Sequence, residues 1–514
     1  MLNLASLLTD SARRRPDKDA LRLGPLATTY AELDDLSART AALLRSRGVK
    51  PGDSVAIALP NLPEFGAIYY GILRAGAVVV PLNVLLKRGE VAFHLKDSGA
   101  KLVFGTVAFL DELTAGAAEA GADFIAVPLP VGDPGEHTPL PDLVREHEPL
   151  TELTPRSPVD PAVLLYTSGT TGKPKGATLT HDNLLWNAFV SANKVVQMTP
   201  DDVVVGALPL FHAFGQSVGM NAALLSGATL SLLPRFEAEG ALDIIEQGGA
   251  TIFLGVPTMY TALLHAESAP KRDLSKLRLC VSGGAAIAVE ILRAFEDQFG
   301  ARILEGYGLS ESSPVASFNH QDRPSKPGSI GTPIWGVEMK AVGDDGHEVP
   351  SGEPGEIWIR GHNVMAGYHN RPDATAETLT EDGWLKTGDV ATVDEDGFFF
   401  IVDRKKDMIL RGGYNVYPRE LEEVLHEHPA VAECAVLGIP HAELGEEVAA
   451  AVVLKPGASA GPDELRAFVK ERVAAYKYPR VVRIVDELPK GATGKILKRE
   501  IELTADEPAA APQA

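Results

Sequence analysis

The chain of 514 residues is long enough for more than one domain at ~100–200 residues each, and its 45% apolar content can fill ordinary globular cores. Its 48 basic and 69 acidic residues give a formal charge of −21, which excludes a broad electrostatic grip on nucleic acid. Any positive charge that holds an anionic ligand must therefore be local.

The cysteines and the apolar runs favour a cytoplasmic protein. Cys280 and Cys434 lie far apart in apolar stretches, so they predict reduced core thiols and neither a disulfide framework nor a zinc site. The N-terminal segment becomes charged at residues 13–15 instead of leading into the apolar core of a secretory signal. No apolar run approaches the ~18 residues of a membrane-spanning helix. We expect a soluble protein that is a monomer or a homodimer. Peripheral contact with a lipid surface is compatible with this sequence.

The first part of the chain alternates helices with buried strands. Thr29 and Glu32 can form a capping box at the start of a helix over residues 29–48. Further elements are expected as strands at 54–59, 77–80 and 101–104 and as a helix at 64–76. This alternation predicts parallel strands covered by helices. The stretch 128–160 is rich in prolines and acids and is expected to connect this part to the next.

A loop rich in glycine and hydroxyl side chains follows the next apolar strand. It reads Tyr-Thr-Ser-Gly-Thr-Thr-Gly-Lys-Pro-Lys-Gly over residues 166–176. Glycines let backbone N–H groups turn inward, hydroxyls add donors, and Lys173 and Lys175 bring positive charge, which together suit a polyphosphate. The spacing is not that of a P-loop, and the loop alone could also be a polar surface turn.

Several strands beyond this loop end in turns that carry chemistry. Strands are expected at 203–208, 251–255, 277–282 and 302–305, and a helix at 182–193. The strand ends lead into His212, into the Gly283-Gly284 pair and into the run Gly306–Glu311. In open parallel sheets, ligands bind beyond the carboxyl ends of the strands. These turns therefore predict one shared site.

The C-terminal third changes in character. Short strands and Gly/Asp turns from about residue 337 indicate antiparallel structure, and a charged run at 403–407 follows. Helices at 418–428 and 462–475 and strands at 431–437, 448–454 and 481–485 then predict a small α+β unit. We expect an α/β fold with an N-terminal domain at 1–402 (parallel sheets and a small β-barrel-like part), a hinge at 403–407, a C-terminal domain at 408–503 and a disordered tail at 504–514.

Six motifs give the chain a family resemblance. They are Tyr166–Gly176, Leu208–His212, Gly306–Glu311, Lys386–Asp389, Asp403–Asp407 and Lys490–Lys495. In this order they are similar to the acyl-adenylate-forming (ANL) superfamily, and the whole chain resembles its bacterial fatty-acid–CoA ligases. The resemblance implies a reaction in two steps. A carboxylate and ATP, with Mg²⁺, give acyl-AMP and pyrophosphate, and coenzyme A then takes the acyl group as a thioester.

The resemblance also assigns roles to single residues. It implies that Thr167 and Glu311 ligate Mg²⁺, that Tyr307 stacks on adenine, and that Asp389 accepts both ribose hydroxyls. The same resemblance extends the ATP- and AMP-binding set to Ser168, Gly169, Thr170, Thr171, Gly172, Lys173, Lys175, Gly283, Gly284, Ala285, Glu305, Gly306, Gly308, Ser310, Val402, Arg404 and Lys495. The residues expected to be catalytic are Thr167, His212, Glu311 and Lys495.

Lys495 belongs to the small domain, so the resemblance implies a domain movement. This lysine would bridge the carboxylate and the α-phosphate during adenylation, and the small domain would then rotate for the second step. Lys406 matches the hinge position of the charged linker. The residues that match the pantetheine channel are Arg411, Gly412, Gly413 and Tyr414.

The acyl pocket decides the substrate. It is expected to be lined by His212, Ala213, Phe214, Val218, Val256, Thr258, Gly306 and Gly331. His212 stands where amino-acid-activating relatives carry an aspartate, so an amino-acid substrate is disfavoured. The lining carries no charged residue, which favours a neutral apolar tail over a dicarboxylate. The small residues Ala213, Gly306 and Gly331 are expected to leave length for a medium or long fatty chain.

Three other functions stay open at this point. The first is an aryl-acid ligase of the 4-coumarate type, and the second is a fatty-acyl-AMP ligase that loads a carrier protein. Against the second stands the absence of an evident long insertion ahead of the small domain. The third is a catalytically silent relative that only binds a ligand, which the presence of all the expected chemical side chains disfavours.

Overall fold

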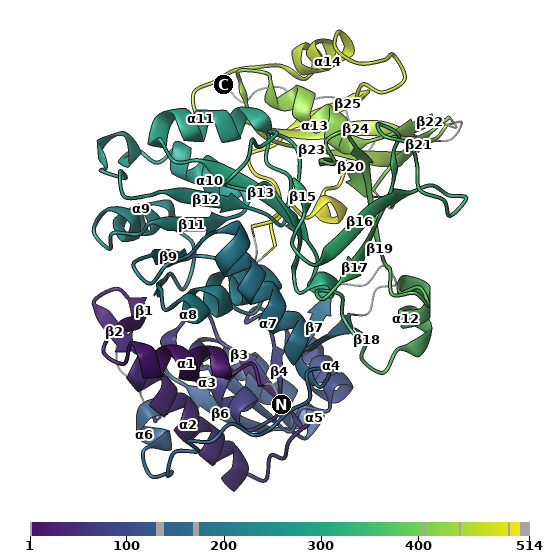
Figure 1. The fold of residues 1–514 in the computed structure, drawn as a ribbon. Coiled ribbons are helices and arrows are strands. Elements are labelled where there is room, and N and C mark those ends of the chain that lie inside the picture. The colour runs from purple at the N-terminus through teal and green to yellow at the C-terminus, as the bar shows by residue number, and fades with distance from the viewer. Residues whose placement is uncertain are drawn as a thin grey trace.

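The structure is a computed structural model that describes residues 3–129, 138–167, 174–404, 407–412, 414–441, 444–491 and 494–503. Within these ranges the chain folds into four sheets (Figure 1). Three sheets belong to the N-terminal part, and the fourth forms the C-terminal domain at the top of the view. The predicted α/β fold with a large N-terminal and a smaller C-terminal domain is confirmed.

The largest sheet has nine strands in the order β15-β14-β13-β12-β11-β9-β10-β1-β2. Its strands are β1 (Asp19–Leu23), β2 (Leu26–Thr29), β9 (Val203–Gly206), β10 (Thr229–Leu232), β11 (Ile252–Gly255), β12 (Leu279–Ser282), β13 (Ile303–Gly308), β14 (Val315–Phe318) and β15 (Thr332–Pro333). The strands from β13 through β1 pair in parallel, whereas β2, β14 and β15 pair antiparallel at the edges. The prediction of parallel strands is therefore correct for the centre of this sheet and not for its edges.

The second large sheet has seven strands in the order β18-β8-β7-β4-β3-β5-β6. They are β3 (Ser54–Ala58), β4 (Val78–Pro81), β5 (Leu102–Thr106), β6 (Asp123–Val127), β7 (Pro161–Thr167), β8 (Lys175–Thr180) and β18 (Gly367–Tyr368). The predicted phosphate loop connects β7 to β8, which pair antiparallel from Thr167 opposite Lys175 onward. The hairpin thus fixes both ends of the loop.

Helices fill the space between these sheets and cover their outer faces (Figure 1). They are α1 (Ser6–Arg14), α2 (Tyr30–Ser46), α3 (Pro63–Arg74), α4 (Arg88–Ser98), α5 (Leu110–Ala120), α6 (Leu140–Val144), α7 (His181–Val190), α8 (Ala222–Ser226), α9 (Ala238–Glu246), α10 (Pro257–Leu264), α11 (Val289–Phe299) and α12 (Pro372–Thr378). The predicted capping box of Thr29 and Glu32 starts α2. Helix α3 contacts strands of both large sheets and is buried from Phe65 to Arg74, as expected of a central helix.

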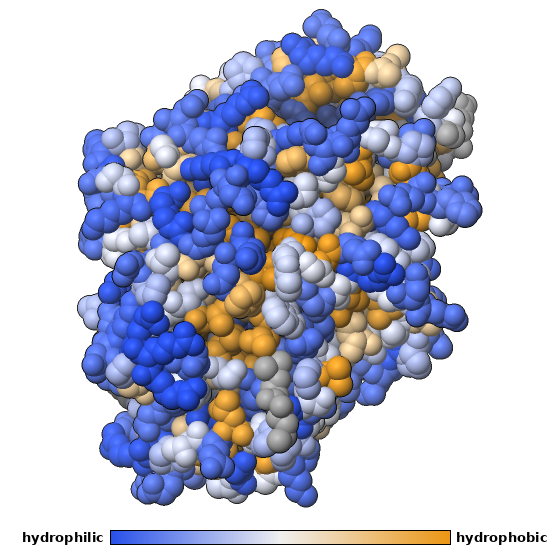
Figure 2. Space-filling model, in the orientation of Figure 1, coloured by the Kyte–Doolittle hydropathy of each residue, from blue (hydrophilic) through white to orange (hydrophobic). Residues whose placement is uncertain are grey.

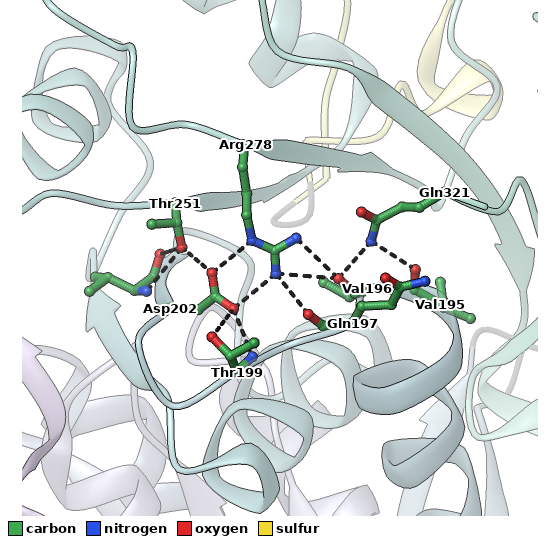
Figure 3. Close-up of polar contacts among 9 residues, drawn as sticks. Val195, Val196, Gln197, Thr199, Asp202, Thr251, Arg278 and Gln321 are labelled. Carbon is green, nitrogen blue, oxygen red and sulfur yellow. Dashed lines mark hydrogen bonds and ion pairs between the residues drawn. The ribbon is translucent and has the colours of Figure 1, made fainter.

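A polar clamp closes the end of the nine-stranded sheet where β9, β11 and β12 begin (Figure 3). The buried carboxylate of Asp202 accepts hydrogen bonds from the Arg278 guanidinium at 2.8 and 2.9 Å and from the Thr251 hydroxyl at 2.6 Å. Arg278 also donates to the carbonyl of Gln197, in the segment that follows α7. A buried charge must be paired and hydrogen bonded, and this clamp meets both needs. It lies at the opposite end of the strands from the predicted site.

The rest of the chain forms two smaller sheets. The strands β16 (Val337–Val342), β17 (Gly355–Gly361), β19 (Leu385–Val393) and β20 (Phe399–Arg404) pair antiparallel. Strand β20 includes the first two residues of the charged run 403–407, which therefore belong to the N-terminal part. The C-terminal domain contains β21 (Ile409–Arg411), β22 (Tyr414–Val416), α13 (Pro418–His426), β23 (Val431–His441), β24 (Gly445–Leu454), α14 (Pro462–Lys470) and β25 (Val481–Ile484).

The surface of the protein is mostly hydrophilic on the face shown. Hydrophilic residues cover most of the face in Figure 2, and hydrophobic residues gather near its centre. Among the helices of the described ranges, none combines the length and the hydropathy needed to cross a lipid bilayer.

Candidate active site

A cavity of about 720 Å³ lies where the carboxyl ends of β12 and β13, the β7–β8 hairpin and β19 meet. The residues on its wall that sequence analysis named are Thr167, Lys175, His212, Phe214, Val256, Gly283, Gly284, Gly306, Tyr307, Gly308, Ser310, Glu311, Asp389 and Lys495. Most of them come from the N-terminal part, and Lys495 comes from the C-terminal domain. The strand ends therefore converge as predicted.

One end of the cavity carries the residues expected to bind the nucleoside. The Tyr307 hydroxyl donates to the carboxylate of Asp389 at 2.5 Å, which fixes both side chains. Asp389 lies on β19 directly opposite Arg404 on β20. Gly308 has no space for a side chain, because a Cβ there would lie 1.8 Å from the carbonyl oxygen of Pro314. This end therefore combines a fixed carboxylate with a stretch of backbone that only glycine can form.

The residues expected to ligate Mg²⁺ lie together at the mouth of the phosphate hairpin. The Thr167 hydroxyl donates to Glu311 Oε1 at 3.3 Å. The described residues hold no cluster of three or more His, Cys, Asp or Glu that could bind a metal without help. A single carboxylate and a hydroxyl suit a hard cation that takes its other oxygen ligands from phosphates and water, as magnesium commonly does in nucleotide sites. These residues fit Mg²⁺ bound together with ATP.

His212 and Lys495 both line the cavity, and the charge of Lys495 acts on His212. Burial, and next the positive charge of Lys495, lower the pKa of His212 to about 4, so this histidine is neutral near pH 7. The loop that carries Lys495 is held against the N-terminal part, because the Thr258 hydroxyl donates to the Gly494 carbonyl at 3.0 Å. The structure therefore shows a closed arrangement with the lysine inside the cavity.

The apolar part of the cavity wall differs from the predicted pocket. Its residues include Leu208, Pro209, Phe214, Val256, Pro314, Val315 and Phe318. Four residues predicted for the pocket do not line this cavity, namely Ala213, Val218, Thr258 and Gly331. Ala213 and Val218 are buried in the core behind it, and Thr258 holds the C-terminal loop.

The two glycines predicted to leave length for the acyl chain have no free volume where a side chain would lie. A Cβ at Gly306 would lie 2.3 Å from the ring of Phe318, so that ring already fills the space. A Cβ at Gly331, where φ is +78°, would lie 2.0 Å from the Phe318 carbonyl. Both positions need glycine because Phe318 approaches them closely, and Phe318 itself lines the cavity.

Other predicted residues lie off the cavity wall. Ala285 is exposed, Val402 is half-buried, and the Glu305 carboxyl is buried beneath the wall. Burial raises the pKa of Glu305 to about 7. Predicted residues outside the described ranges are Ser168, Gly169, Thr170, Thr171, Gly172, Lys173, Lys406 and Gly413.

The residues expected to bind coenzyme A lie on the outer strands of the C-terminal domain. Arg411 on β21 pairs with Glu447 at 2.5 Å, and the backbone of Gly412 has φ +56°. Tyr414 on β22 is 58% exposed and stacks on Tyr476 with ring centroids 4.7 Å apart. These strand residues do not line the cavity in this closed arrangement.

The sequence analysis assigned no role to several residues that line the cavity. Tyr368 donates from its hydroxyl to Glu311 Oε1 at 2.8 Å, and Lys175 Nζ lies 5.2 Å from the centre of its ring. Lys386 and Glu356 also line the wall, and Glu356 accepts a hydrogen bond from the Gly388 backbone at 2.9 Å. Only Lys386 had a local signal, because it begins the motif that ends at Asp389.

Comparisons with known proteins agree with this arrangement. Residues 8–369 match the AMP-binding enzyme family, and residues 420–495 match the AMP-binding enzyme C-terminal domain. The chain is 39% identical to a long-chain-fatty-acid–CoA ligase of Bacillus subtilis (strain 168), over 97% of this chain and 94% of that protein. It is 41% identical to a feruloyl-CoA synthase of an Amycolatopsis species, over 95% and 96%. Among solved structures, ATP-bound MatB from Rhodopseudomonas palustris matches with a TM-score of 0.90 and 34% identity, over 97% of this chain and 98% of that one.

Proposed function

Because the chain belongs to the AMP-binding enzyme family and is an AMP-forming acid–CoA ligase, we propose that its acid is a medium- or long-chain fatty acid. The acid would be activated as acyl-AMP with release of pyrophosphate, and the acyl group would then pass to coenzyme A. The observation that carries the proposal is the cavity itself, whose wall combines residues expected to bind the nucleotide, several apolar residues and Lys495 of the C-terminal domain.

The closed arrangement suits the first step. A carboxylate oxygen attacks the α-phosphorus of ATP, and the bond to pyrophosphate breaks. The fixed positive charge of Lys495 would offset the charge that develops between the acid and the α-phosphate. His212, neutral beside this lysine, adds no second positive charge. Mg²⁺, held by Glu311 and Thr167, would neutralise charge on the leaving phosphates.

The second step needs a different arrangement of the domains. Arg411, Gly412 and Tyr414 lie off the cavity wall, so rotation of the C-terminal domain would be needed to bring them to it and to withdraw Lys495. A movement of this kind gates access to the site and supplies no new chemistry. We propose that coenzyme A enters along these strands after pyrophosphate leaves.

The apolar end favours a monocarboxylic acid with a neutral tail. Phe214, Val256 and Phe318 are buried apolar residues of the cavity wall, and they offer no charge to a tail that lies against them. A second carboxylate placed there would lose its hydration without gaining a cation, at a cost of several kcal/mol. Dicarboxylic acids are therefore expected to be poor substrates.

An aryl acid is the second candidate, and one observation favours it. The Phe214 ring lies 3.1 Å from where a Gly283 Cβ would be, and the Phe318 ring fills the space beside Gly306. Two rings beside the ends of neighbouring strands suit a flat aromatic tail, because aromatic pairs gain energy beyond the area that they bury. One relative bears the name feruloyl-CoA synthase.

A panel of acids separates the two candidates. Purified protein is incubated with ATP, Mg²⁺, coenzyme A and acids from acetate to palmitate, together with 4-coumarate, ferulate and malonate. Thioester formation is followed for each acid as kcat/KM. The proposal predicts the highest values for medium or longer fatty acids and negligible turnover of malonate. Highest activity with acetate would contradict it, and highest activity with an aromatic acid would establish the second candidate in its place.

A further inference from the structure

Tyr368 contacts the carboxylate that is expected to bind the metal, although it lies 57 residues away in the sequence. Its hydroxyl donates to Glu311 Oε1 at 2.8 Å, and the Thr167 hydroxyl donates to the same oxygen at 3.3 Å. Both hydrogen bonds therefore reach one side of the carboxylate. In this geometry Oε2 is the oxygen left to face a cation.

The fold holds the Tyr368 side chain in place from several sides. Strand β18 pairs with β8, which places Tyr368 opposite Ala177 at the base of the phosphate hairpin. The Tyr368 backbone N–H donates to the Thr375 hydroxyl at 2.9 Å, and the Thr378 side chain hydrogen bonds to the Tyr368 hydroxyl. Lys175, on β8, lies over the ring. The hydroxyl is thus a fixed donor attached to the same hairpin that carries Thr167.

We propose that Tyr368 is a positioning residue that holds Glu311 in the orientation in which its free oxygen ligates the divalent cation of metal-bound ATP. This inference rests on the proposed function. Groups that hydrogen bond to a metal ligand fix its orientation, and their loss commonly weakens metal affinity 10- to 100-fold. Without the hydroxyl, Glu311 would have to give up rotational freedom when the cation binds.

Metal binding tests the inference without turnover. Mn²⁺ is titrated into the full chain with a non-hydrolysable ATP analogue and no acid, and free Mn²⁺ is measured by electron paramagnetic resonance. Tyr368→Phe keeps the ring and removes the hydroxyl, and we expect it to weaken Mn²⁺ binding about 10- to 100-fold. Tyr70→Phe is the matched control, because it removes a buried hydroxyl that donates to Asn221 at 2.7 Å within the core. Its Mn²⁺ affinity should equal that of the wild type.

Kinetics then separate positioning from a purely structural role. In acyl-AMP formation, Tyr368→Phe is expected to raise the KM for Mg·ATP, whereas thioester formation from supplied acyl-AMP, which needs no metal-bound ATP, should be unchanged. If Tyr368→Phe lowers the melting temperature sharply, Thr378→Val, which removes the hydroxyl that contacts Tyr368, is measured in its place, with weaker Mn²⁺ binding again expected.

Two outcomes would separate a failure of this inference from a failure of the proposed function. Mn²⁺ affinity within twofold of the wild type in Tyr368→Phe would overturn the inference and leave the proposed function intact. A wild-type chain that binds no Mn²⁺ with the ATP analogue would instead contradict the proposed function itself.

Discussion

Replacing Glu305 by glutamine should remove a pH dependence from the stability of the fold. Glu305 ends the buried part of β13, with 2% of its surface exposed. Its Oε1 accepts a long hydrogen bond from the Ile287 backbone at 3.4 Å, and its Oε2 has no partner among the described residues. Arg419 and Glu423, both on α13 of the C-terminal domain, are the charged groups that act on it. Burial outweighs the arginine and raises the pKa of Glu305 to about 7.

The sign and size of the effect follow from this pKa. The unfolded chain releases the proton near pH 4.5, whereas the folded chain keeps it up to about pH 7. The stability that Glu305 contributes is therefore complete below pH 4.5 and is lost as the pH rises toward 7. The whole change is about 3 kcal/mol, of which about 2 kcal/mol falls between pH 5.5 and 8.

Denaturant unfolding at pH 5.5 and pH 8 measures this difference. The Glu305→Gln variant carries no titrating group at this position, so relative to the wild type it should gain about 2 kcal/mol on going from pH 5.5 to pH 8. Glu290→Gln, at an exposed position of α11, is the control and should follow the wild type at both values. Parallel pH profiles for Glu305→Gln and the wild type would refute the raised pKa.

Three further changes probe the reaction, the pocket and the clamp. Lys495→Ala is expected to abolish acyl-AMP formation, measured as pyrophosphate release, and to spare thioester formation from supplied acyl-AMP; equal loss of both would contradict the domain rotation. Phe318→Ala should shift kcat/KM in the acid panel toward longer tails by opening the space beside Gly306, and an unchanged ranking would show that this ring does not limit the tail. Arg278→Met leaves the buried Asp202 carboxylate without its cation and should lower the free energy of unfolding by about 3 kcal/mol. This value is at the low end for a buried ion pair because Arg278 is partly exposed. Arg145→Met, which breaks an exposed ion pair, should cost less than about 1 kcal/mol in the same denaturant titration.

Local signals explain which elements could be predicted from the sequence. Helix α2 carries its own capping box, and strands such as β11 and β12 are short apolar runs that end at small residues. Strand β10, Thr-Leu-Ser-Leu at residues 229–232, has no such run and becomes a strand through its parallel pairing with β9 and β1. The antiparallel pairing of the edge strands was also not predicted. The alternation of helices and strands along the sequence does not indicate how strands pair at the two edges of a sheet.

The site shows the same division between short-range and long-range information. Glu311 and Asp389 lie in compact motifs, so their presence could be inferred from neighbouring residues. Tyr368 reaches Glu311 only because β18 pairs with β8, and the residues next to Tyr368 in the sequence do not predict this pairing. The closed position of Lys495 depends likewise on the contact between Thr258 and Gly494, which joins two domains.

The acyl pocket shows why counting small residues can mislead. A glycine enlarges a pocket only if nothing else occupies the volume where its side chain would be. At Gly306 that volume holds the Phe318 ring, and at Gly331 it holds the Phe318 backbone. Protein interiors are close-packed, so a missing side chain in a buried wall is usually filled by a neighbour. Tail length is therefore expected to depend on Phe318, which sequence analysis did not name, more than on the two glycines that it did.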